Sequence, residues 1–237
     1  MSLGFGSRAR IGHLYPSGGL CDYEIQLMAP AGVQFVTTRL PFRDTSIASD
    51  HAIIDDLERH AALLADARVS LIALNCTAAG VVGGAGTINA RIEASTGIPA
   101  VTTIEAVMAA CRAAGARRVG LLTPYRAEVV SAEKLFLQTE GISVVSEAHL
   151  PQATPVEQAE IAPARWLQLA RELDADIDAI LVSCAGIQLA TVIASIEAAT
   201  GKPVICSNGA MLWYCLSRLR VEARPPGYGA LLAGRFD

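Results

Sequence analysis

The sequence predicts an α/β fold with two pseudo-symmetric lobes, each a mainly parallel sheet flanked by helices, and a functional site in the cleft between them. Three observations predict it. Short runs of Ile, Leu and Val alternate with segments of helical periodicity, as in parallel α/β proteins. The chain repeats itself at an offset of about 108 residues. Two of the apolar runs end at a cysteine, where open α/β sheets bind ligands.

The first half of the chain is predicted to contain four strands and three helices. The strands are expected at 10–14, 33–38, 69–75 and 100–103, and the helices at 51–66, 87–96 and 104–114. The helix over 51–66 follows from apolar residues spaced near 3.6. Gly97 and Pro99 end the helix over 87–96. The glycine-rich segment 80–86 is predicted to be a tight turn whose backbone lies close to a small anion.

The second half repeats the alternation. Strands are expected at 119–122, 142–147, 180–183 and 203–206, and helices at 126–139, 161–173, 188–199 and 209–220. Segment 148–160 is predicted to be a loop, and 223–237 a tail rich in Pro and Gly.

The internal repeat supports a domain duplication. RIGHLYP (10–16) matches RVGLLTP (118–124), and Cys76 matches Cys184 at the same offset of 108. TGIP (96–99) matches TGKP (200–203) at an offset of 104, which also pairs Cys111 with Cys215. We therefore expect lobe one to comprise about 1–100 plus 205–237, and lobe two about 101–204.

Composition excludes several classes of protein. The 237 residues are 52% hydrophobic, but no uninterrupted apolar run approaches the roughly 20 residues of a membrane span, and no signal peptide is evident. A formal charge of −4 without basic runs argues against nucleic acid as a partner. We expect a soluble, cytoplasmic protein with no membrane partner, and a homo-oligomer is compatible with the sequence. No metal-ligand cluster or nucleotide fingerprint is present, so no metal and no cofactor are expected.

Six cysteines are spread through apolar or helical contexts, which favours reduced thiols over disulfides. Cys111 and Cys215 fall within helices and are predicted to be core residues. A cysteine after an apolar strand is usually a small buried hydrophobe, but the paired positions of Cys76 and Cys184 favour a chemical role. Both precede apparent helix starts, which lower a thiol pKa. His13 is more readily explained as a packed side chain than as a catalytic one.

Two thiols on opposite sides of a substrate carbon support two kinds of chemistry. One thiol could remove a proton while the other supplies one at the opposite face; alternatively, one could add to a double bond while the other protonates the adjacent carbon. Either needs a substrate carboxylate held by hydrogen-bond donors. Thr77, Ser183, Tyr125 and the 80–86 backbone are the candidates.

Several short motifs in order resemble one enzyme group. They are YPSGGL (15–20), the strand-Cys-Thr turn at 71–77, TPY (123–125), SCAG (183–186) and ARPPGYGALL (223–232). The chain resembles the Asp/Glu/hydantoin racemase superfamily, in particular its branch of maleate cis-trans isomerases and arylmalonate decarboxylases. The resemblance implies a nucleophile or base at Cys76, an acid/base at Cys184 and small-carboxylate binding by Pro16, Ser17, Gly18, Gly19, Thr77, Ala78, Tyr125, Ser183, Ala185 and Gly186.

Departures from the branch narrow the function. The decarboxylases carry Gly where this chain has Cys76, which favours chemistry with two thiols. The isomerases have one Asn in the first loop and another after the mid-chain strand, where this chain has Gly18-Gly19 and Gln152-Ala153-Thr154. The sequence thus predicts a cofactor-independent isomerase or racemase of a small carboxylate or dicarboxylate. A decarboxylase using Cys184 as proton donor, or a non-catalytic small-molecule binding protein, are the alternatives.

Overall fold

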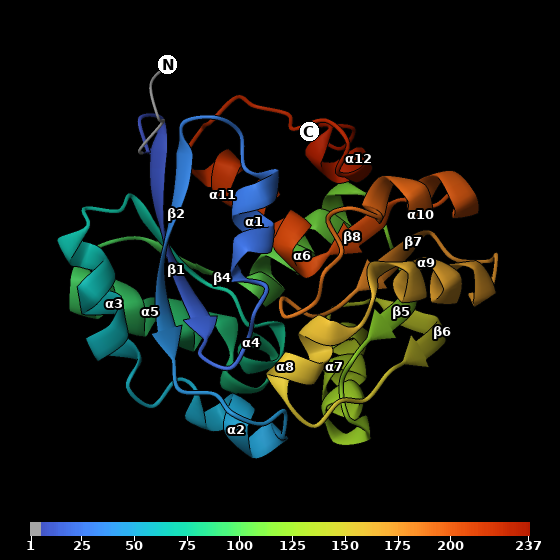
Figure 1. Ribbon diagram of the computed structural model, residues 1–237, viewed down its shortest axis with the longest axis horizontal. Coiled ribbons are helices and arrows are strands. Elements are labelled where there is room, and N and C mark those ends of the chain that lie inside the picture. Colours follow the sequence, from blue (N-terminus) through green and yellow to red (C-terminus); the bar gives the residue numbers. More distant parts are fainter. Residues whose placement is uncertain (1–5) are drawn as a thin grey trace.

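The computed structural model describes residues 6–237 and contains two four-stranded parallel sheets side by side (Figure 1). The first has the order β2-β1-β3-β4 and the second the order β6-β5-β7-β8. Their strands are β1 Ala9–Pro16, β2 Val33–Leu40, β3 Leu71–Leu74, β4 Ala100–Thr102, β5 Arg118–Thr123, β6 Ser143–His149, β7 Ala179–Val182 and β8 Val204–Cys206. The predicted two-lobed α/β fold is confirmed.

Strand register follows the sequence repeat. Ile11 pairs with Leu71 between β1 and β3, and Val119 pairs with Ala179 between β5 and β7. Val119 and Ala179 are numbered 108 higher than Ile11 and Leu71, so the equivalent strands of the two sheets pair in the same register. β3 and β7 are buried along their whole length because helices cover both faces, which explains their continuous apolar sequences.

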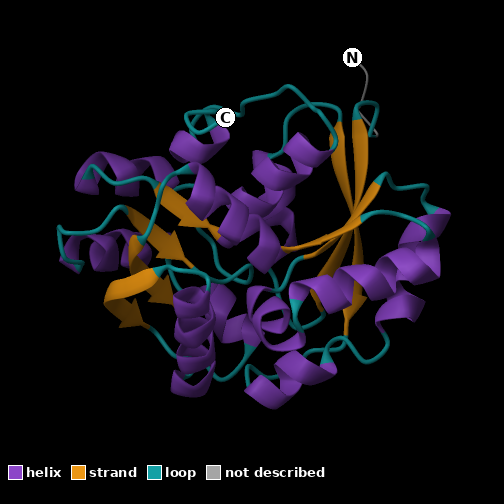
Figure 2. Cartoon of the chain, turned by 180° about the vertical axis from the view of Figure 1, so that it is seen from behind, coloured by secondary structure: helices purple, strands orange, loops and turns teal. Residues whose placement is uncertain are grey.

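Helices surround both sheets and fill the space between them (Figure 2). They are α1 Asp22–Met28, α2 Ile47–Ala52, α3 Leu57–Asp66, α4 Thr77–Gly83, α5 Ala85–Thr96, α6 Thr103–Ala113, α7 Ala127–Thr139, α8 Pro155–Glu160, α9 Pro163–Glu172, α10 Ile193–Thr200, α11 Ser207–Arg218 and α12 Gly229–Leu232. No helix of the described chain is long and apolar enough to cross a membrane.

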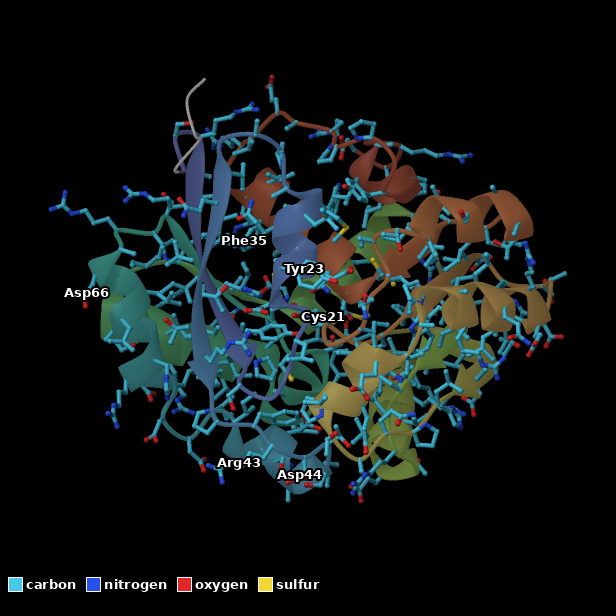
Figure 3. All side chains as sticks on the ribbon, viewed as in Figure 1. Cys21, Tyr23, Phe35, Arg43, Asp44 and Asp66 are labelled. Atoms are coloured by element: carbon cyan, nitrogen blue, oxygen red, sulfur yellow. The ribbon has the colours of Figure 1, made fainter. Side chains whose placement is uncertain are left out.

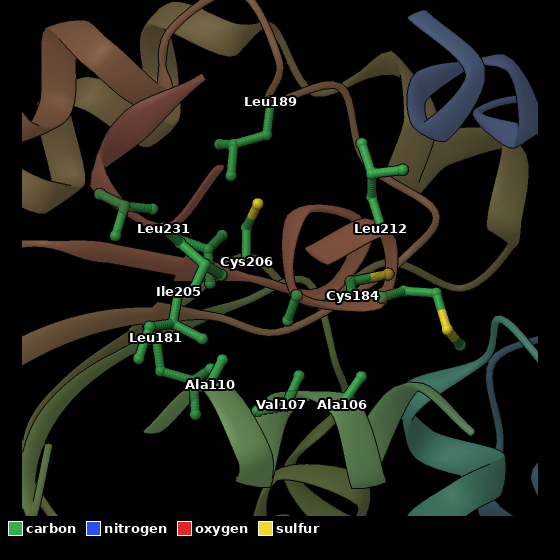
Figure 4. Close-up of a cluster of buried hydrophobic side chains, with 14 of the residues drawn as sticks. Ala106, Val107, Ala110, Leu181, Cys184, Leu189, Ile205, Cys206, Leu212 and Leu231 are labelled. Carbon is green, nitrogen blue, oxygen red and sulfur yellow. The ribbon is translucent and has the colours of Figure 1, made fainter. Parts of the chain in front are cut away.

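The two lobes share one continuous apolar core. Ala106, Val107 and Ala110 of α6 pack toward Leu181 of β7 and Ile205 of β8 (Figure 4). The same core extends to β1 and β2 in the first sheet. Cys111 and Cys215 are fully buried within it, as predicted, and all six cysteines are buried free thiols.

Several local predictions were wrong. The helix expected over 51–66 is two helices, α2 and α3, separated by turns at residues 53–56. Helix α8 lies where a loop was expected, and it is started by a capping box between Thr154 and Glu157. α12 lies within the expected tail, and α1 was not predicted.

The glycine-rich segment 80–86 is also not the tight turn that was predicted. It forms the end of α4, a bend at Gly84 and the start of α5. At Gly80, a Cβ atom would lie 2.8 Å from Cγ2 of Ile104, so glycine here allows α4 to approach α6 closely. The segment contributes packing, and its residues do not line the cavity described below.

Candidate active site

A cavity lies beyond the carboxyl ends of β3 and β7, and both strand-end thiols line it. Its volume is about 30 Å³. Nine of the predicted site residues line this cavity: Pro16, Gly19, Cys76, Thr77, Ala78, Tyr125, Cys184, Ala185 and Gly186. The structure therefore brings together residues from both lobes that are far apart in the sequence.

Three predicted substrate-binding residues do not line the cavity. Ser17 is exposed, and its hydroxyl accepts a hydrogen bond from the Phe42 backbone N–H at 3.0 Å. The N–H of Gly18 donates to the carbonyl of Phe42 at 3.0 Å. The buried hydroxyl of Ser183 is hydrogen-bonded to the Glu133 carboxyl on α7. Ser17 and Gly18 thus fasten the first loop to the end of β2, and Ser183 is held from behind by α7.

Cys76 is the N-cap residue of α4, in extended backbone conformation. Burial raises the pKa of its thiol well above the ordinary value, and the neighbouring Asp50 carboxyl raises it further. The backbone N–H groups of Ala79 and Ala78 act in the opposite direction, but their effect is smaller than that of burial. The helix start lowers this pKa, as expected, but burial outweighs it, so the prediction of a net lowering was wrong.

Cys184 does not begin a helix, contrary to prediction: residues 185–192 form turns, and α10 begins at Ile193. Instead, the N–H of Gly186 donates to the sulfur at 3.1 Å. Burial raises the pKa of the Cys184 thiol to about 12, although this N–H and the Tyr125 hydroxyl partly oppose the rise. Cys184 is consequently a protonated thiol at neutral pH, a state suited to donating a proton.

Each thiol faces one side-chain oxygen from a short helix. Cys76 Sγ lies 3.9 Å from Asp50 Oδ1 on α2, and Cys184 Sγ lies 3.6 Å from Gln158 Oε1 on α8. Asp50 and Gln158 are again 108 residues apart, as are the ends of α2 and α8. Both residues line the cavity and were missed from the sequence. The offset of 108, together with the helix caps Ser46 and Thr154, was the signal that could have revealed them.

A buried polar network supports the floor of the cavity. The Asn75 amide donates to Asn208 Oδ1 at 2.8 Å and lies 3.0 Å from His13 Nε2. The Asn208 amide and the Tyr15 hydroxyl both donate to the carbonyl of Ala185, at 3.1 and 3.3 Å. This network fixes the turn that carries Cys184 against the first lobe.

His13 belongs to this network and is fully buried, as the packed-side-chain interpretation predicted. Burial lowers its pKa to about 4, so the imidazole is neutral at physiological pH.

A second polar link joins the two thiol-bearing turns: Thr77 Oγ1 lies 2.8 Å from Ser207 Oγ, which accepts a hydrogen bond from the Cys184 N–H at 3.1 Å.

The remaining cysteine near the cleft has a structural role. Cys21, at the start of α1, is buried where the lobes meet (Figure 3), and its N–H donates to the Tyr15 hydroxyl at 3.2 Å.

The part of the chain described by the structure contains no group of three or more His, Cys, Asp or Glu side chains arranged to hold a metal ion. The cavity offers hydroxyl, amide, carboxyl, thiol and backbone groups for binding a small polar molecule.

Comparison with known proteins identifies the family. The model of the family described as "Arylmalonate decarboxylase" matches residues 13–232. The chain belongs to this family. Its curated relatives include a maleate isomerase of Pseudomonas putida, 26% identical with 96% of this chain and 98% of the relative covered. The arylmalonate decarboxylase of Bordetella bronchiseptica is 27% identical, with 91% of this chain and 92% of the relative covered.

Solved structures of this family share the fold. A variant of a maleate isomerase from Pseudomonas putida, solved with maleate, gives a TM-score of 0.89 at 27% identity, covering 96% of this chain and 98% of that one. A double mutant of arylmalonate decarboxylase in its liganded form gives 0.87 at 26% identity, covering 94% and 98%. The predicted membership of the maleate isomerase and arylmalonate decarboxylase branch is confirmed, and the chain resembles enzymes of both kinds.

Proposed function

We propose that this chain is a cofactor-independent isomerase or racemase of a small carboxylate or dicarboxylate, with Cys76 and Cys184 as its reacting groups. The observation that carries the proposal is that both thiols, from equivalent positions in two lobes, line one small cavity. A ligand in that cavity would have one thiol on each side. The likeness to maleate isomerases over almost the whole chain supports the same reaction class.

In the isomerase version, Cys76 reacts as a thiolate, having released its proton to water before the substrate binds. Its sulfur bonds to one carbon of a double bond, Cys184 gives its proton to the other carbon, and the thiolate of Cys76 is regenerated when the C–S bond breaks. Rotation about the resulting single bond follows. The Cys184 thiolate then removes the proton again, the C–S bond breaks and the double bond re-forms in the other geometry. The high pKa of Cys184 suits its role as the initial acid.

In the racemase version, the thiolate of one cysteine removes a proton from the substrate carbon while the thiol of the other protonates the opposite face. Both versions develop negative charge on the substrate carboxylate. The hydroxyl groups of Thr77 and Tyr125 are the donors we assign to that charge.

A decarboxylase is the second candidate, and the family match together with the Bordetella relative favours it. In this case the substrate loses carbon dioxide, and Cys184 protonates the resulting carbanion. Cys76 would then be dispensable, which separates the two candidates experimentally.

The test is a substrate screen in deuterated water, followed by NMR, on wild type and on Cys76→Ala and Cys184→Ala variants. Dicarboxylates, substituted malonates and amino acids form the panel, and the spectra report isomerisation, proton exchange and decarboxylation together. We expect either substitution to lower turnover by about 100-fold or more, because each removes an obligatory proton-transfer or bond-forming group.

Cys111→Ala and Cys215→Ala are matched controls, since these thiols are also related by the repeat but lie in the core away from the cavity. They should keep the wild-type reaction. Retained carbon dioxide release in Cys76→Ala with loss in Cys184→Ala would identify the decarboxylase. Full activity in Cys184→Ala would rule out every version.

A further inference from the structure

Among the cavity-lining residues in the described part of the chain, Asp50 is the only Asp, Glu, Lys, Arg or His. Only 2% of its surface is exposed. Its carboxyl receives one side-chain hydrogen bond from the described residues, from the Cys76 thiol at 3.9 Å. A thiol is a weak donor, and a buried carboxylate without strong donors is costly. The carboxyl therefore has unused hydrogen-bonding capacity where a ligand would sit.

The equivalent position in the other lobe is neutral. Gln158 occupies the fourth position of α8, as Asp50 does in α2, and faces Cys184 as Asp50 faces Cys76. Its amide can both donate and accept hydrogen bonds. The repeat thus provides two polar side chains at corresponding positions and gives only one of them a charge.

These two helices belong to the same side of the cavity. The segments preceding them are hydrogen-bonded to each other, because the Thr45 N–H donates to the Ala153 carbonyl at 3.2 Å and its hydroxyl donates to the Gln152 carbonyl at 2.6 Å. The thiol-bearing turns come from the strand ends, whereas Asp50 and Gln158 come from α2 and α8 and lie 3.9 and 3.6 Å from the two sulfurs. The two side chains form a polar subsite beside the thiols.

The charge of this subsite limits what can bind there. No Lys, Arg or His lines the cavity within the described residues. A carboxylate group of the ligand beside Asp50 would have no cation to offset the repulsion, whereas a hydrogen-bond donor would fill the unused capacity of the carboxyl.

We propose that Asp50 and Gln158 bind a hydrogen-bond-donating substituent, so that the substrate carries one carboxylate and, at its other end, an ammonium or hydroxyl group. This inference rests on the proposed small-carboxylate chemistry and narrows its substrate class. It disfavours a dianion such as maleate. Asp50 and Gln158 are specificity-determining residues in this assignment, and the thiols keep the bond-making roles.

The surroundings of Asp50 define the pH at which this preference holds. The groups acting on its carboxyl are Asp44 before α2 (Figure 3), Glu128 at the start of α7 and Cys76 on α4. Burial, followed by the charges of Asp44 and Glu128, raises the pKa of Asp50 to about 7, while the thiol hydrogen bond lowers it slightly. The carboxyl is therefore ionised, and attracts a cation most strongly, above that pH.

The test uses four ligands with the same chain and different ends: propionate, 3-hydroxypropionate, β-alanine and succinate. Isothermal titration calorimetry on wild type at about pH 8 should give binding of β-alanine and 3-hydroxypropionate about tenfold or more tighter than propionate, with succinate weakest. Comparison of the first two ligands distinguishes an ammonium from a hydroxyl substrate. The advantage of β-alanine over propionate should shrink toward about pH 5.5, where Asp50 is protonated.

Asp50→Asn should abolish the advantage of β-alanine and its pH dependence, and should strengthen succinate binding about tenfold. Asp55→Asn is the control, because it removes the same charge from an exposed position nearby. The pH series on wild type tests the same point if Asp50→Asn does not fold.

The inference would be overturned if succinate bound wild type most tightly, or if Asp50→Asn kept the wild-type order of ligand affinities. Neither result would bear on the two-thiol reaction, which is tested separately by the turnover of the cysteine variants. Binding of none of the four ligands at millimolar concentration would instead overturn the small-carboxylate chemistry on which the inference rests.

Discussion

Glu133→Gln should stabilise the protein at neutral and alkaline pH. Glu133 lies on α7 with its carboxyl fully buried, bonded on one oxygen to Ser183, while its other oxygen has no partner. Burial raises its pKa from 4.5 to about 7, and the Ser183 hydrogen bond only partly opposes this. Glutamine has nearly the shape of the protonated acid but cannot ionise.

The sign and size of the effect follow from linkage. Because the pKa is higher in the folded state, the stability that this group contributes is fully present below about pH 4.5 and is lost as pH rises through about 7. The difference between 4.5 and about 7 corresponds to about 3 kcal/mol. The free energy of unfolding of Glu133→Gln, relative to wild type, should therefore rise by about 3 kcal/mol between pH 4.5 and pH 8.

Urea unfolding of both proteins across this pH range measures the difference. Asp50 also titrates near neutrality, but it is present in both proteins, so its contribution cancels. Glu140→Gln, at the exposed end of the same helix, should leave the pH dependence unchanged. A stability difference between Glu133→Gln and wild type that is constant with pH would refute the reasoning, because it would mean that Glu133 ionises alike in both states.

Two further predictions concern the thiols and the helix packing. Iodoacetamide should label Cys184 in the folded protein about 100-fold more slowly than a free cysteine at pH 8, because the pKa of Cys184 is about 12. The labelling rate should rise with pH, and peptide mass mapping measures it. Labelling at the rate of a free cysteine would contradict the pKa. Gly80→Ala should lower the free energy of unfolding by about 1–3 kcal/mol, because the added Cβ atom would contact Ile104. Gly86→Ala is the control and should not be destabilising, because no atom lies within 4 Å of the added Cβ atom. Equal effects of the two substitutions on urea unfolding would exclude the close α4–α6 contact as the cause.

The duplicated fold and the two thiols could be recognised from the sequence because their signals are local or periodic. β3 and β7 are continuous apolar runs, and such runs identify buried parallel strands without knowledge of what packs on them. The offset of 108 then brought Cys76 and Cys184 into equivalent positions at strand ends. The cavity they share follows from the general geometry of parallel sheets.

The subsite and the ionisation of the thiols were decided by tertiary structure. α2 and α8 have six residues each, too few for an apolar periodicity to identify them, so periodicity did not place Asp50 and Gln158 beside the thiols. The sequence indicated that helix starts would lower the pKa of both thiols, but no helix begins at Cys184, and burial outweighs the N–H groups near Cys76. Sequence patterns specify which segments form strands and helices; the pKa of a buried group depends on all the atoms that exclude water from it, and those atoms come from both lobes.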